Sequence, residues 1–348
     1  MTKLVLSTGN VMSSGPSVIR KSGSGSRSNL ELLNSLRDNF SEAKRDYAAA
    51  SRARTTTNGV VVNGDDDSTT SRDGDDNGNS HGNSHGHGHG IHHNGTSTPP
   101  TPVELWTARE GKVVYVPRIN WQGAGLRDDA NQYEITVKLF LLPGTSVAER
   151  GQHVSEALAL VARELGTPTI DLLVASFPGI SFEGTCEWEA DKKNAHQGNL
   201  DEELATWAIF ERLHQDGIAK KLGVAEFGSE KLGAFIERAR VAPVVDQINL
   251  HDCCNVPPPL KRLAEARGIE LNVHRDCTDI LPHGTLRELL GPGTCGANVL
   301  ADEETGGGAS GLQGNLAPQW VVRYMAFVRD RGVIENKGYF AGAELVEG

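Results

Sequence analysis

Residues 133–143 read YEITVKLFLLP, and they are followed by VSEALALVARELG at 154–166 and by IDLLVASFP at 170–178. The first and third segments are nearly continuous apolar runs, which are typical of strands covered on both faces. In the middle segment the apolar residues recur at helical spacing. A strand, a helix and a second strand in this order predict two parallel strands joined by a crossover helix.

The alternation continues on both sides of this unit. Toward the C-terminus the pattern predicts helices at 200–217, 229–241, 257–268 and 317–332, and strands at 218–228, 243–251, 269–275 and 332–339. Toward the N-terminus it predicts strands at 3–11 and 113–116 and a helix at 29–50. The predicted helices often stop at a glycine, as C-terminal capping does, at Gly166, Gly217, Gly268 and Gly332. About eight strands alternating with helices favour a closed α/β barrel of the (β/α)8, or TIM, type.

A doubly wound open sheet is the alternative architecture. Such a sheet binds a dinucleotide at a glycine-rich turn, but SGSGSRS at residues 22–28 lacks the required spacing and precedes no tight strand-to-helix turn. We therefore expect one barrel domain over residues 1–348.

Two segments interrupt this domain. Residues 52–102 are dominated by Thr, Asn, Gly, Asp, Ser and His, so they bury too little apolar surface to offset the entropy lost on ordering. We expect this insertion to be disordered, and residues 303–314 to form a flexible glycine-rich loop.

The composition narrows the class of protein. A net charge of −11 argues against broad binding to nucleic acids or anionic membranes, which requires clustered Lys and Arg. The sequence contains no apolar run long enough to span a membrane, and its odd number of scattered cysteines does not fit a secreted disulfide framework. We expect a cytoplasmic protein with free thiols.

Two segments resemble the aldo-keto reductase family. LGVAEFGSEKL at 222–232, followed by VAPVVDQINLH at 241–251, is similar to a Gly-Val-Ser-Asn-Phe strand, a helix and an Asn-Gln-Val strand. IDLLVASFP is similar to the Asp-Leu-x-x-x-His-x-Pro strand of the same family. The resemblance implies a barrel on which a carbonyl is reduced by nicotinamide hydride, while a Tyr tuned by Lys and Asp and helped by His donates a proton.

The residues at the catalytic positions depart from that pattern. Lys138 falls where the family places its Lys, but Ser176 stands in the His position. Asp128 and Tyr133 have the spacing of the family's Asp and Tyr, yet Tyr133 comes five residues before Lys138, where the family inserts a helix. We expect Tyr133 to end a loop at a strand's first residue, and we expect no catalytic residues, only a vestigial Lys138 and Ser176.

The cofactor positions are also altered. The Ser and Asn that would hold the nicotinamide amide are Ala225 and Glu226, whereas the matching Gln is kept as Gln247. Lys337 falls at the position of the family's phosphate-contacting Lys. The resemblance implies no working cofactor, with vestigial NADPH binding at Gln247 and Lys337 as the open alternative.

A more specific resemblance is to the family of regulatory subunits of glutamate–cysteine ligase. It rests on residues 246–281 with their double Cys and Pro-rich helix start, on 318–339 ending in RGVIENKGY, and on the opening LSTGNVMSSG at 6–15. The resemblance implies a heterodimer with the ligase's catalytic subunit, improved use of glutamate, relieved feedback by glutathione and no chemistry of its own. It also implies a redox-sensitive link to that partner through Cys253 and Cys254, for which two partly buried apolar side chains are the plainer alternative.

Other functions stay open from sequence. One is an NADPH-dependent aldo-keto reductase with a displaced set of catalytic residues. Another is metal binding by the His-rich run at 81–93, although a low-complexity tract usually binds metal weakly, and we expect no metal site. The helix at 200–217 has mostly core-packing residues, and its Trp207 could either pack in the core or anchor a partner; the sequence does not choose between these roles.

Overall fold

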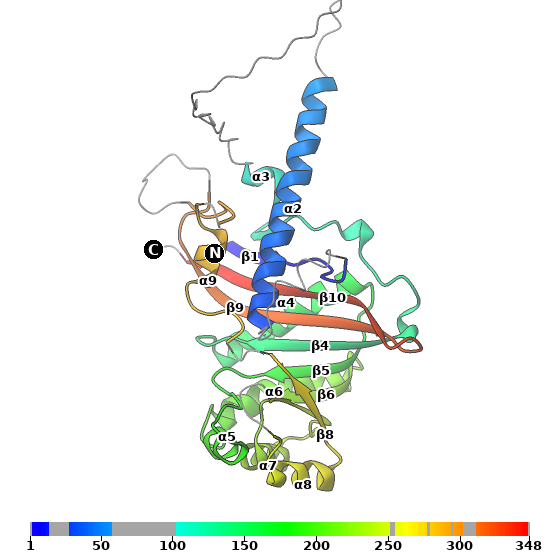
Figure 1. Ribbon diagram of the computed structural model, residues 1–348, viewed down its shortest axis with the longest axis vertical. Coiled ribbons are helices and arrows are strands. Elements are labelled where there is room, and N and C mark those ends of the chain that lie inside the picture. Colours follow the sequence, from blue (N-terminus) through cyan, green and yellow to red (C-terminus); the bar gives the residue numbers. More distant parts are fainter. Residues whose placement is uncertain are drawn as a thin grey trace, which may run out of the picture.

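The computed structural model describes residues 2–13, 28–57, 102–250, 255–276, 279–293, 296–301 and 311–346. In these ranges ten strands form one mixed sheet (Figure 1) in the order β2-β3-β1-β10-β9-β4-β5-β6-β7-β8. The strands are β1 (Thr2–Ser7), β2 (Ala108–Glu110), β3 (Val113–Val116), β4 (Tyr133–Leu141), β5 (Ile170–Ser176), β6 (Ala219–Ala225), β7 (Val245–Asn249), β8 (Glu270–His274), β9 (Asn315–Val328) and β10 (Val333–Val346). The α-helices are α2 (Ser28–Thr57), α3 (Val103–Trp106), α4 (Val147–Leu165), α5 (Glu187–Asn194), α6 (Leu200–Gln215), α7 (Ser229–Arg238), α8 (Pro258–Arg267) and α9 (Thr285–Leu290).

The half of the sheet from β4 to β8 is parallel, as the alternation predicts. Its connections contain α4, α6, α7 and α8. Ser146 caps α4 in a capping box with Glu149, and Gly166 ends it in the left-handed conformation. Gly268 ends α8 in the same way.

The other half of the sheet corrects one prediction. Residues 317–332 are not a helix: most of them belong to β9, which pairs antiparallel with β10 on one side and β4 on the other. Gly332, with φ 62°, lies in the turn of this β9–β10 hairpin rather than at a helix end. Both faces of β9 are covered, so its sequence is a nearly continuous apolar run. The hydrophobic periodicity of such a run does not distinguish a strand from a helix.

The α/β class is confirmed. The strand order contains two edge strands, which the prediction of a closed barrel does not include. β2 and β8 stand at the two edges, and within the described ranges no pairing between them closes the sheet. The N-terminal helix also runs further than expected, since α2 continues to Thr57. The remainder of the 52–102 insertion up to residue 101, and residues 303–310 of the glycine-rich loop, lie outside the described residues.

Helices pack on both faces of the sheet because alternate residues of each strand point to opposite sides. Val137 and Leu139 of β4 join one apolar core with α4, α6 and α7. Phe140 and the adjoining Leu142 join a second core with α2 and α9. None of the helices in the described ranges combines the length and the apolar character that crossing a membrane requires.

Candidate functional site at the carboxyl ends of the parallel strands

Several polar side chains gather where the parallel strands end. Parallel strands bring their carboxyl ends to one edge, and ligands of open α/β sheets bind at that edge. Lys138 lies inside β4, Ser176 is the last residue of β5, Glu226 follows β6 and Asp276 follows β8. All four are buried. The chain therefore places charged groups at the position where an α/β protein usually carries its site.

The centre of this cluster is a buried carboxylate between two cations. Nζ of Lys138 lies 2.8 Å from Oδ2 of Asp276, and Arg323 of β9 pairs with the other carboxylate oxygen. Burial alone would raise the pKa of Asp276, but Arg323 and Lys138 hold it well below its usual value. Burial lowers the pKa of Lys138 in spite of this partner. Asp276 therefore stays ionised and holds both cations in place.

A histidine and a second carboxylate adjoin this triad. Nε2 of His274 lies 2.8 Å from Oε1 of Glu226 and 3.0 Å from the carbonyl oxygen of Gln247. The backbone N–H of Asp276 donates to Nδ1 of His274 at 2.9 Å, so the ring proton belongs on Nε2. Glu226 itself has φ 66°, a left-handed backbone that is unusual for Glu. The His274 ring thus links Glu226 after β6, Gln247 of β7 and Asp276 after β8.

A tyrosine approaches the cluster from β10. The hydroxyl of Tyr339 donates to Oε1 of Glu31 at 3.0 Å. Burial raises its pKa well above the usual value, while Arg323 acts in the opposite direction. A reductase would need a tyrosine whose proton is made available by a neighbouring cation. Here the phenol donates to Glu31, and the negative charge of that carboxylate adds to the rise in its pKa.

The predicted site residues fall in different places. Gln247 lies in β7 beside the cluster, but Lys337 lies in β10 and pairs with Glu31 at 2.5 Å. Four strands separate β7 from β10, so the structure does not bring Gln247 and Lys337 together. Tyr133 begins β4, as expected, and its hydroxyl donates to Glu335 at 2.8 Å.

The remaining predicted positions are not all covered by the structure. Cys253, Cys254 and the His-rich run at 81–93 lie outside the described residues. Among the residues that are described, no group of three or more His, Cys, Asp or Glu side chains could hold a metal ion.

Sequence reasoning missed Asp276, His274 and Arg323. The signal for the first two was present, because charged residues directly after a parallel strand point to its carboxyl edge. Arg323 could not be found in that way, since its segment was interpreted as a helix.

A second buried carboxyl, Asp246 of β7, gives a testable pH dependence. One of its oxygens accepts the backbone N–H of Phe227 at 3.4 Å, and the other has no hydrogen-bond partner in the part of the chain that the structure describes. Burial raises the pKa of Asp246 well above its usual value, and the negative charge of Glu226 adds to the rise. The stability that this group contributes is therefore fully present below its unfolded pKa, about 3.9, and is lost as the pH rises through the folded pKa.

Asp246→Asn is expected to unfold like the parent protein near pH 4 and to be more stable than the parent at pH 8, because the amide carries no charge to bury. Urea unfolding of both proteins between pH 4 and pH 8 measures this difference. A difference that is constant over the whole range would contradict the prediction.

Comparison with known proteins identifies several that are similar to this chain. Residues 119–288 match the model of the Aldo/keto reductase family. A protein of Schizosaccharomyces pombe assigned as a glutamate–cysteine ligase regulatory subunit is 27% identical over 244 residues, which is 67% of this chain and 79% of the relative. The glutamate–cysteine ligase regulatory subunit of Homo sapiens is 25% identical over 217 residues, or 62% of this chain and 68% of its own.

Among solved structures, an aldo-keto reductase of Bombyx mori in complex with NADP is similar to this chain at 23% identity and a TM-score of 0.29. The match covers 40% of each chain. The matched family segment contains β4 to β8 and therefore the parallel strands that carry the cluster, which agrees with the predicted aldo-keto reductase kind of fold. By sequence, the chain is similar to glutamate–cysteine ligase regulatory subunits, and its residues 119–288 match the model of the Aldo/keto reductase family.

Proposed function

We propose that this chain is a non-catalytic, cytoplasmic regulatory subunit that binds the catalytic subunit of glutamate–cysteine ligase as a heterodimer. In this role it improves the partner's use of glutamate and relieves its feedback inhibition by glutathione. The observation that carries the proposal is the environment of Tyr133 and Tyr339. Their hydroxyls donate to Glu335 and Glu31, which add to the effect of burial in raising the pKa of each phenol, whereas a proton-donating tyrosine needs a cation that lowers it. The similarity to regulatory subunits supports the same function.

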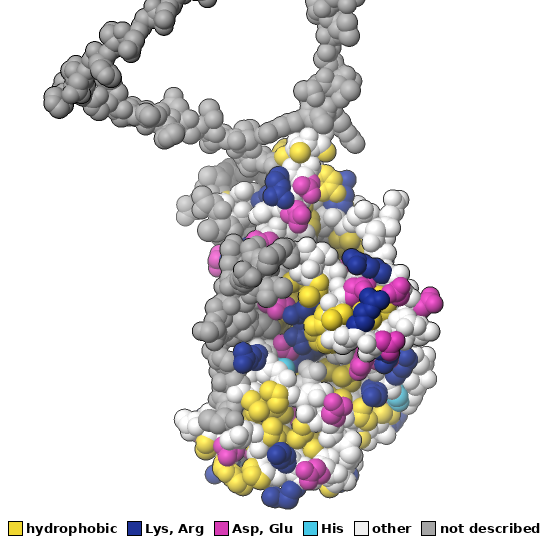
Figure 2. Space-filling model, turned by 45° about the vertical axis from the view of Figure 1, so that its right-hand side comes forward, with side chains coloured by type: hydrophobic (Ala, Val, Ile, Leu, Met, Phe, Trp, Pro, Cys, Tyr) yellow, Lys and Arg dark blue, Asp and Glu magenta, His cyan; other side chains and the backbone are white. Residues whose placement is uncertain are grey.

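Regulation of this kind needs only a difference in affinity. If the chain binds the active form of the catalytic subunit more tightly than the inactive form, binding shifts the population toward the active form. On the face shown in Figure 2, charged side chains of both signs are interspersed with hydrophobic ones. Interfaces between separately folded subunits have about the same apolar share as the rest of a protein surface, so this face is compatible with binding a partner.

Trp188 of α5 is our candidate anchor for the partner. Its side chain is 55% exposed, which is unusual for a large aromatic residue, and Trp is enriched among residues that dominate binding energy. α5 is also polar, with acidic residues in its first turn and basic residues in its last turn. An exposed aromatic among charges offers both apolar contact and complementary ion pairs.

The test mixes the purified chain with the ligase's catalytic subunit. We expect a 1:1 complex by sedimentation, a lower KM for glutamate and a higher glutathione concentration for half-inhibition. Trp188→Ala should weaken the complex at least tenfold, a typical loss for an anchor residue. Val333→Ala, which truncates an exposed side chain of β10, is the matched control and should bind normally. No complex at micromolar concentrations would refute the proposed function.

An NADPH-dependent aldo-keto reductase is the second candidate, favoured by the family match and by Lys138 at the family's position. Titration with NADPH, followed by tryptophan fluorescence, and turnover of a generic aldehyde decide between the two. Saturable binding with turnover that Lys138→Met abolishes would establish the reductase. Binding without turnover would fit a regulatory subunit with a vestigial nucleotide site at Gln247 or Lys337.

A further inference from the structure

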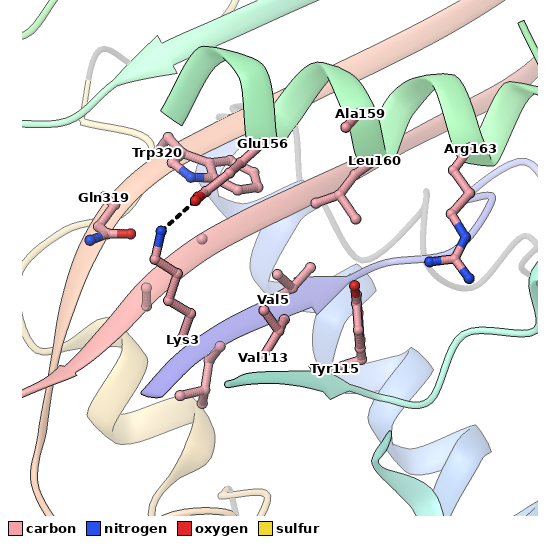
Figure 3. Close-up of a pocket in the computed structure, with 13 residues that line it drawn as sticks. Lys3, Val5, Val113, Tyr115, Glu156, Ala159, Leu160, Arg163, Gln319 and Trp320 are labelled. Atoms are coloured by element: carbon pink, nitrogen blue, oxygen red, sulfur yellow. Dashed lines mark hydrogen bonds and ion pairs between the residues drawn. The ribbon is translucent and has the colours of Figure 1, made fainter. Parts of the chain in front are cut away.

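A hollow lies away from the strand-end cluster. It is a cavity of about 260 Å³ between α4 and strands β1, β3, β9 and β10 (Figure 3). Its walls are mainly apolar and include Val5, Val113, Leu160 and the indole of Trp320. A volume of this size is at the small end of ligand pockets. The occupant would therefore be a small molecule with a large apolar surface.

Small residues create this space. Gly342 of β10 lies directly against the indole of Trp320, since a Cβ at this position would come within 2.3 Å of an indole carbon. A larger residue here would force the indole out of its place. Ala159 of α4 adds a short side chain to the lining. The hollow is thus bounded by two small residues and one flat aromatic side chain.

The polar groups of the lining lie at the two ends of the cavity. Figure 3 shows Lys3, Glu156 and Trp320 gathered at one end and Tyr115 and Arg163 at the other. Lys3 pairs with Glu156, which also accepts a hydrogen bond from Gln152 at 2.8 Å. Arg163 pairs with Glu110 at 3.7 Å, so both cations of the lining are ion-paired and its preference for an anion must come from individual N–H donors.

One donor in the lining has no partner among the described residues. Nε1 of Trp320 is buried and makes no hydrogen bond to any residue that the structure describes, and a buried N–H without an acceptor is costly. The ammonium of Lys3 has three N–H donors, and within the described ranges it donates to Glu156. This end of the cavity therefore offers an N–H and an ammonium to an acceptor that the protein does not supply.

We propose that this cavity binds a small, flat aromatic carboxylate. Its carboxylate accepts hydrogen bonds from Nε1 of Trp320 and from Lys3, while its ring packs between Val5 and Leu160. A good ligand must carry both an apolar ring and an anionic acceptor, so amines and simple alcohols are expected to bind poorly. The binding site is independent of the strand-end cluster.

The experiment uses the full chain labelled with ¹⁵N at tryptophan and titrated with naphthalene-2-carboxylate. The indole signal of Trp320 is identified by its loss in Trp320→Phe. We expect this signal to shift saturably, and the alcohol 2-naphthylmethanol to bind at least tenfold more weakly. Ala159→Leu fills the cavity from an exposed position on α4 and should weaken binding at least tenfold, whereas Ser155→Leu, one turn earlier and outside the lining, should leave it unchanged.

Three outcomes would overturn the proposal. The first is no saturable shift at millimolar carboxylate. The second is equal binding of the acid and the alcohol, or equal binding by Ala159→Leu and the parent protein. The third is a shift of the Trp320 signal with protein concentration alone, which would mean that a second copy of the chain occupies the hollow.

Discussion

Asp276→Asn is expected to lower the free energy of unfolding by about 3–5 kcal/mol, the cost of removing one partner from a buried ion pair. Asparagine has the same size as aspartate, but it leaves Lys138 and Arg323 as buried cations without the carboxylate that they share. Urea unfolding at pH 7 measures the loss. The loss should shrink below about pH 4, because the stability from a group with a depressed folded pKa is fully present above its unfolded pKa and is lost as the pH falls toward the folded pKa.

The control for this substitution is Asp201→Asn, which removes an ion pair with Arg238 at the surface. The Asp201 side chain is 78% exposed, so the expected loss is below about 1 kcal/mol. If both variants lose the same amount, the cluster at the strand ends is not a buried electrostatic unit.

Phe235→Ala is expected to cost about 3–5 kcal/mol because it opens a cavity in the largest apolar core. The ring of Phe235 lies 5.3 Å from that of Trp207 and 5.2 Å from that of Phe227, both near perpendicular, and 6.4 Å from that of Phe177. One side chain of α7 thus joins rings from α6 and from the segments after β5 and β6. Thermal and urea unfolding report the loss.

Phe235→Leu keeps most of the volume and should cost less than the alanine variant. Val273→Ala, on an edge strand and with a side chain that is 62% exposed, should change stability by no more than about 0.5 kcal/mol. An equally small effect of Phe235→Ala would show that the aromatic cluster is not tightly packed.

The parallel half of the fold could be predicted from the sequence because each element there repeats one simple pattern. Runs such as IDLLVASFP are short, apolar and bounded by polar or glycine residues, and the helices between them end at Gly166 and Gly268. APQWVVRYMAFVRDRG also ends at a glycine, but Gly332 lies in a hairpin turn and not at a helix end. Its Val321 and Val322 favour a strand, but a buried run with covered faces has no period, so length alone suggested a helix.

The candidate site was predictable only in part. Lys138 and Ser176 could be located because a family pattern marks their strands. The partner of Lys138 could not be located, since Asp276 follows a different strand more than a hundred residues later and Arg323 lies in the misassigned segment. Ion pairs of this kind depend on which strands are neighbours, and sequence periodicity does not contain that information.

The position of the β9–β10 hairpin has a consequence for how the chain is made. The ribosome produces β1 to β8 first, and without the hairpin they would be two separate sheets, β2-β3-β1 and β4 to β8. Until β9 and β10 emerge, β1 and β4 each expose an unpaired edge that invites aggregation. A premature stop codon after residue 300 would therefore remove the seam between the two halves, so it should be as damaging as a lesion in the middle of the gene.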